Sequence, residues 1–258
     1  MPAPTTLILI HGATGNGRMW DAVRRHLDPR WQVHTPDLPG HGSRRSESFT
    51  LDAAVATVID VVSRVAPARV VVGGDSLGGY VSLASAPALP AGQLAALVLS
   101  GSSANFTGGA LRALQRRWLT MRVMRALLGD ARIVAMVAKE LRKQGIDAGD
   151  VQAIVDGGLN PAVFGECVQA LRDIDFRARA AQVAQPVLVL NGSKDRIFID
   201  QEDAFVAALQ RPARQRFEGC DHGVSLRRPR EFAAAIDAFV ASALADPAAE
   251  RREPALHG

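Results

Sequence analysis

Short runs of apolar residues alternate with segments of helical hydrophobic spacing, and this alternation limits the possible folds more than any other feature of the chain. Six runs are predicted strands, at residues 7–10, 32–36, 70–73, 95–100, 187–190 and 214–218. Five patterns are predicted helices, at residues 18–27, 51–65, 77–86, 201–209 and 229–244. Thr50 suits a helix N-cap, and Pro229 suits a first helical turn. Because most strands are continuously apolar, the pattern predicts an α/β fold, doubly wound, with a mostly parallel sheet of about six strands.

The alternation stops between residues 104 and 179, where no strand-like run is found. Apolar residues recur there at helical spacing, among them Leu111, Leu114, Trp118, Met121 and Met124. We therefore predict a helical cap at residues 104–179, inserted into an α/β core formed by residues 1–103 and 180–246. Residues 247–258, rich in Pro, Ala and charge, are predicted to be a flexible tail.

Composition and charge exclude several classes of protein. The chain has 258 residues and a net charge of +4, which fits one large domain with an insertion. Nine basic residues lie between residues 112 and 143, but no stripe of exposed aromatics or recognised module accompanies them, so nucleic-acid binding is not predicted.

The apolar runs are too short to cross a bilayer, and no secretion signal precedes the first strand. Cys167 and Cys220 lie far apart, which favours a reduced, cytoplasmic location without a disulfide or metal site.

A Gly-x-Ser-x-Gly motif stands between a predicted strand and a predicted helix, at residues 74–78. At such a turn the serine adopts a strained backbone that projects its hydroxyl above the sheet edge. Gly74 and Gly78 are expected because side chains at these positions would collide across the turn. An ordinary tight turn with a surface serine is the alternative, but the flanking elements favour Ser76 as a nucleophile. Asp75 is predicted to pack or hydrogen-bond away from the pocket.

A serine nucleophile needs a general base, and histidine has a suitable pKa. Of the six histidines, His222 follows the last predicted strand, so its loop is expected at the carboxyl edge of the sheet. Asp195 follows the fifth predicted strand and is predicted to orient the imidazole. Asp200 and Asp203 compete for this role, but we interpret them as cap and first-turn residues of the next helix. The predicted catalytic residues are therefore Ser76, Asp195 and His222.

A glycine-rich loop at residues 11–17 follows the first strand. The backbone N–H of Ala13, together with that of Leu77 after the nucleophile, is predicted to form a two-donor oxyanion hole. Phosphate binding is the alternative for such a loop, but the Gly-Lys-Ser/Thr ending of a P-loop and a Gly-x-Gly-x-x-Gly motif are both missing. We therefore predict neither a nucleotide nor another cofactor.

Five segments together resemble the small α/β-hydrolases of the esterase and enol-lactonase group, in order and in spacing, over about residues 7–244. They are residues 11–12, 36–43, 74–78, 191–195 and 221–223. The resemblance implies the α/β-hydrolase fold without the N-terminal hairpin of larger members. It also implies that His11 and His41 are structural loop residues. Serine at the nucleophile position argues against haloalkane dehalogenase and epoxide hydrolase chemistry.

The same resemblance implies a serine hydrolase of the carboxylesterase or lactonase type, which cleaves an ester or lactone of a small organic molecule through an acyl-enzyme on Ser76. A thioesterase or a C–C bond hydrolase would use the same residues, and a non-catalytic ligand receptor on this fold is the alternative from another class. The expected partners are a small-molecule ester, lactone or thioester, with no membrane or nucleic acid, and the protein is expected to be a monomer or homodimer. The basic insertion is interpreted either as a solvated helix face or as an attraction for an anionic substrate.

Overall fold

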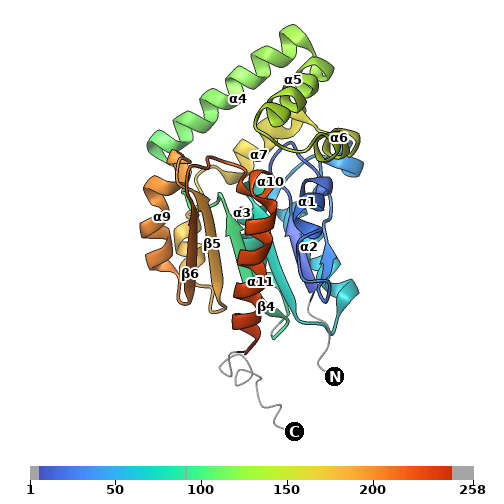
Figure 1. Cartoon of the computed structure of the whole chain (residues 1–258). Helices are drawn as coiled ribbons and strands as arrows, with labels where there is room; N and C mark the ends of the chain where they lie inside the picture. The colour runs from blue at the N-terminus through green and yellow to red at the C-terminus, as the bar shows by residue number, and fades with distance from the viewer. Residues whose placement is uncertain (1–5, 91, 246–258) are drawn as a thin grey trace.

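The computed structural model describes residues 6–90 and 92–245, and it is built around one six-stranded sheet (Figure 1). The strands are β1 (Thr6–Ile10), β2 (Gln32–His34), β3 (Val70–Asp75), β4 (Leu94–Ser100), β5 (Val187–Gly192) and β6 (Pro212–Phe217). They lie in the order β2-β1-β3-β4-β5-β6, and every neighbouring pair is parallel. The predicted parallel sheet of about six strands is confirmed. The predicted tail at residues 247–258 lies outside the described residues.

Both faces of the sheet are covered, as the continuous apolar strands require. Along β1, Leu7 and Leu9 pack on one side with Trp20 and Phe232, whereas Ile8 belongs to the core on the other side. The first side is covered by α1 (Asp21–Arg24) and α11 (Pro229–Ala245), and the second by α2 (Leu51–Val65), α3 (Leu77–Ser85), α8 (Phe176–Ala181) and α9 (Arg196–Ala208). This two-sided packing confirms the doubly wound fold.

The helix boundaries follow local capping. Thr50 Oγ1 accepts a hydrogen bond from the N–H of Ala53 at 3.1 Å, so α2 begins as predicted. The helix predicted at residues 18–27 is wrong in length: a 3₁₀ turn, η1 (Gly17–Trp20), capped by Asn16, leads into α1, which ends at Arg24. Pro29 follows soon after, and the residue before a proline rarely adopts helical backbone angles.

The helix α9 begins at Arg196 and not at residue 201 as predicted. Its buried residues Phe198, Glu202 and Phe205 keep helical spacing from the first turn onward, which sets the early start. Asp200 and Asp203 therefore lie inside the helix, and the interpretation of these two residues as its cap and first turn is wrong.

The segment between β4 and β5 is helical, and its first four α-helices lie above one end of the sheet (Figure 1). They are α4 (Gly108–Leu128), α5 (Asp130–Lys143), α6 (Ala148–Asp156) and α7 (Phe164–Leu171), with the 3₁₀ turn η4 (Pro161–Val163) before α7. Asn16 Nδ2 donates to the carbonyl of Ile154 at 2.8 Å, and Arg25 pairs with Asp150 at 2.7 Å, so α6 is tied to the region around β1. Over residues 6–90 and 92–245, no helix combines the length and apolarity needed to cross a membrane.

The register of the strands brings their carboxyl ends to one edge. Ile10 pairs with Gly74, Asp75 pairs with Ser100, and Ser100 pairs with Leu190. The loops that follow β1, β3, β4 and β5 therefore leave the sheet side by side, beneath the helices of the insertion. The remaining short helices are η2 (Gly42–Arg44), η3 (Ala86–Ala88) and α10 (Val224–Arg227).

Candidate active site

The turn between β3 and α3 holds Ser76 in a strained conformation. Its φ is 56° and its ψ is −115°, a combination that non-glycine residues adopt rarely and that is found at functional sites. A Cβ on Gly74 would lie 2.6 Å from the carbonyl oxygen of Gly78 and 2.7 Å from that of Ile10. A Cβ on Gly78 would collide with the Ile10 carbonyl. Only glycine fits at these two positions, so the turn can be this tight and the Ser76 side chain stays half-buried at the sheet edge.

Asp195 and His222 come from different loops and meet at the same edge. Asp195 directly follows the turn after β5 and occupies the N-cap position of α9, and its carbonyl accepts from the N–H groups of Phe198 and Ile199. The Nδ1 of His222 lies 2.6 Å from Oδ2 of Asp195. The rigid start of α9 thus fixes the carboxylate that holds the imidazole.

The surroundings of His222 set its protonation. Burial in the site wall lowers the pKa of His222, but the hydrogen bond to Asp195 and the negative charges of Asp75 and Asp195 outweigh it, so the net pKa is raised above its ordinary value. The positive charge of Arg117 opposes this rise. A raised pKa suits a group that must take a proton and return it near neutral pH.

Two residues that sequence reasoning missed position the imidazole. The ring of Phe198 stacks on that of His222, with centroids 5.1 Å apart and an angle of 16° between the planes. Gly101, with φ +54°, leaves room on another side, because a Cβ there would lie 2.9 Å from Cε1 of His222. The end of β4 at Ser100 was the available signal for Gly101, and the buried, helically spaced Phe198 would have required the true start of α9.

Asp75 contributes to the wall of the site, and the expectation that it points away from the pocket is wrong. Its hydrogen bonding is as predicted: the buried carboxylate accepts from Ser100 Oγ at 2.7 Å and from Ser225 Oγ at 3.2 Å. Burial raises the pKa of the Asp75 carboxyl, and the charge of His222 and the two hydroxyls oppose the rise. A second carboxylate therefore stands near the imidazole, beside Asp195.

The two predicted oxyanion donors both border the same space. Leu77 is the first residue of α3, where a helix leaves its N–H groups without internal partners. Within residues 6–90 and 92–245, neither the N–H of Leu77 nor that of Ala13 has a hydrogen-bond acceptor. Both donors are available to an oxygen atom of a ligand near Ser76.

His11 and His41 support the loop that carries Ala13. Both are buried, with ring centroids 4.8 Å apart. The Nε2 of His11 accepts from the N–H of Leu38 at 3.1 Å, and the Nε2 of His41 accepts from the N–H of Thr14 at 3.1 Å. Burial lowers the pKa of both imidazoles, that of His41 to about 3, so they are neutral and structural, as the resemblance implied.

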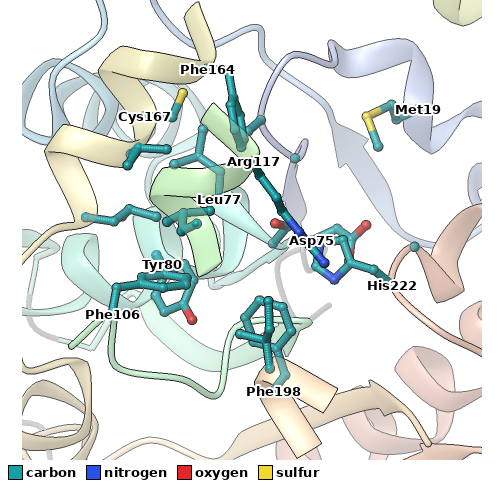
Figure 2. Close-up of a pocket in the computed structure, with 18 of the residues that line it drawn as sticks. Met19, Asp75, Leu77, Tyr80, Phe106, Arg117, Phe164, Cys167, Phe198 and His222 are labelled. Atoms are coloured by element: carbon teal, nitrogen blue, oxygen red, sulfur yellow. The ribbon is translucent and has the colours of Figure 1, made fainter. Parts of the chain in front are cut away.

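Ser76, His222 and the oxyanion donors line one cavity of 290 Å³, which is small for a ligand pocket (Figure 2). Most of its wall is apolar and includes Leu77, Tyr80, Phe106, Leu114, Phe164 and Leu226. The helical stripe of α4 divides: Leu114 faces this cavity, whereas Trp118 lies against Gly165 of α7. In the described part of the chain the Ser76 hydroxyl makes no hydrogen bond, and such bonds often tighten only when a substrate is bound.

The competing aspartates are occupied elsewhere. Asp200 faces Arg196 one turn earlier in α9, and Asp203 pairs with Arg214 and Arg216 of β6. Cys167 and Cys220 are both buried free thiols. No cluster of three metal-binding side chains is found among the residues that the structure describes.

A doubly wound parallel sheet with a serine elbow, a histidine and an aspartate at one edge defines the class of α/β-hydrolases. Residues 7–235 match the model of the "Alpha/beta hydrolase family", and the chain belongs to this family.

Characterised relatives agree with that assignment, and a solved structure shares the fold. The chain is similar to the pimeloyl-[acyl-carrier protein] methyl ester esterases of Nitrosomonas europaea (30% identity, 90% of this chain and 94% of the relative) and Aromatoleum aromaticum (30% identity, 91% and 97%). Its fold is similar to that of a thermophilic esterase from Thermogutta terrifontis, with a TM-score of 0.73, 20% identity and coverage of 94% of this chain and 92% of that one.

Proposed function

We propose that the protein is a serine hydrolase that cleaves carboxylic esters through an acyl-enzyme on Ser76. The observation that carries this proposal is the convergence of a strained Ser76, the 2.6 Å pair of Asp195 and His222, and two unpaired N–H groups on one apolar cavity. A receptor would need the apolar cavity but not the other three features.

In the proposed reaction, Ser76 Oγ attacks the ester carbonyl carbon while Nε2 of His222 takes the hydroxyl proton. Asp195 keeps the Nδ1–H of the imidazole oriented and stabilises the imidazolium. The N–H groups of Ala13 and Leu77 donate to the oxyanion. The bond to the alkoxide then breaks, and the alkoxide takes the proton from His222. Water repeats these steps on the acyl-enzyme, releases the acid and restores the Ser76 hydroxyl.

Short 4-nitrophenyl esters test this proposal. We expect wild-type protein to release 4-nitrophenol, and Ser76→Ala to lower kcat by at least about 10⁴-fold without lowering the midpoint of thermal unfolding. A fluorophosphonate probe should add its mass to the peptide that contains Ser76. Undiminished turnover by the variant would remove Ser76 from the mechanism, and a wild type that neither turns over nor is labelled would favour the receptor alternative.

A methyl ester of a carrier-bound acyl chain is a second candidate substrate, favoured by the names of the two relatives and by the basic residues of α4 and α5. The apolar cavity suits an acyl chain, and a basic surface attracts an anionic carrier. To test this candidate, methanol release from the methyl ester of pimeloyl-[acyl-carrier protein] is compared with methanol release from dimethyl pimelate, which has no carrier. Equal kcat/KM for the two would exclude a contribution from the carrier.

A further inference from the structure

The cavity holds one permanently charged cation among its described lining residues. The guanidinium of Arg117 reaches from α4 toward His222, and Leu114, one turn earlier on the same helix, lines the same space (Figure 2). The rest of the wall around it is largely apolar. Arg117 is exposed to solvent at the cavity, and its positive charge disfavours the charged form of His222.

Water solvates the guanidinium of Arg117, and no side chain or carbonyl of the described residues accepts a hydrogen bond from it. Within the described chain it makes no hydrogen bond or ion pair, whereas Arg125 of the same helix pairs with Asp130 at 2.6 Å. The two carboxylates near the imidazole are already engaged: Asp195 binds His222, and Asp75 accepts from two serine hydroxyls. The fork of N–H donors on Arg117 is therefore free for a group that enters the cavity.

A carboxylate has the charge and shape that this fork binds best, through two parallel hydrogen bonds. Bound there, it would also offset the repulsion between Arg117 and the imidazolium that forms during ester cleavage. The largely apolar wall of the cavity suits the short hydrocarbon chain that would join the ester to the carboxylate.

We propose that Arg117 is a specificity-determining residue that binds a free carboxylate of the substrate, so that the preferred substrates are half-esters of dicarboxylic acids rather than neutral esters. This inference rests on the proposed ester hydrolysis, and it adds the substrate class to it.

The test compares two esters with the same five-carbon acyl chain, mono-4-nitrophenyl glutarate and 4-nitrophenyl pentanoate, which differ by the terminal carboxylate. We expect wild-type kcat/KM to be at least about 10-fold higher for the glutarate half-ester, as charge-assisted hydrogen bonds predict. Measured at a pH well above the pKa of His222, where the imidazole is neutral in both proteins, Arg117→Gln should lower the ratio of kcat/KM for the half-ester to that for the neutral ester by about 10- to 100-fold, mainly through KM for the half-ester. Arg117→Lys, which keeps the charge but loses the fork, should retain part of the preference.

Arg116→Gln is the matched control, because Arg116 is exposed on the same helix, as Arg117 is, but does not line the cavity. It should preserve the preference for the half-ester. If both esters are hydrolysed and Arg117→Gln leaves their ratio unchanged, the inference is overturned while the proposed function stands. If neither ester is hydrolysed, the proposed function fails and the inference fails with it.

Discussion

At the scale of single residues, the imidazole of His222 is governed by three charged neighbours. Asp195 and Asp75 stabilise its protonated form, and Arg117 destabilises it. Sequence reasoning identified Asp195 from its place after a strand. It missed the position of Asp75 and the reach of Arg117, because the direction of a side chain depends on how the elements pack and not on sequence spacing.

The charge of Asp75 leads to a prediction for the pH dependence of catalysis. In the proposed mechanism, His222 must be neutral to take a proton, so kcat/KM should rise with pH through a pKa above the ordinary value. Asp75→Asn removes a charge that favours the imidazolium, and the acidic limb of the profile should therefore move to lower pH. Ser225→Ala, which keeps the carboxylate, is the control. A limb that stays in place in Asp75→Asn would mean that this carboxylate is uncharged in the working enzyme.

At the scale of elements, α9 is attached to the sheet through a buried carboxylate. Glu202 is fully buried, accepts from Asn191 Nδ2 of β5 at 2.8 Å and pairs with Arg216 of β6. This contact holds the helix whose first residues carry Asp195 and Phe198. The predicted helix began too late because we interpreted Asp200 as its cap, whereas the apolar residues from Ile197 to Ile199 already form its first turn, with Phe198 buried.

We predict that Glu202→Gln lowers the free energy of unfolding by about 2 kcal/mol, because the fully buried carboxylate gives up its charge-assisted hydrogen bonds to Asn191 and Arg216. Asp203→Asn, at an exposed neighbouring position, should change it by less than about 0.5 kcal/mol. Urea unfolding of the two variants measures the difference. Equal effects would show that the burial of Glu202 adds nothing to its contribution.

At the scale of the whole molecule, the strands could be predicted to within about two residues. The four inner strands, β1, β3, β4 and β5, are buried and continuously apolar, whereas the edge strands β2 and β6 are largely exposed. The spacing of the insertion also predicted its helices. Their position over the carboxyl edge follows from contacts such as that of Asn16 with Ile154, which join residues far apart in the sequence and leave no local pattern.

The buried neutral histidines make the whole fold sensitive to acid. His41 titrates near 3 when folded and near 6.5 when unfolded, so between these pH values the unfolded chain binds more protons and stability falls as the pH is lowered. The loss approaches about 1.4 kcal/mol per pH unit for each such histidine. Urea unfolding at pH 7, 6 and 5 should show this slope, and His41→Gln should reduce it, while a substitution of exposed His26 should not. An unchanged slope in His41→Gln would contradict the assignment.

The placement of α4–α7 over the sheet edge separates two tasks in space. The groups proposed to break the bond come from loops at the strand ends, whereas Arg117 and Leu114, which also line the cavity, belong to α4, which lies above the sheet. Substitutions on α4–α7 should therefore change which substrates bind and leave the groups that cleave the ester unchanged. An engineer who wants a new acid or alcohol accepted would redesign α4 and leave β3, β5 and their loops untouched.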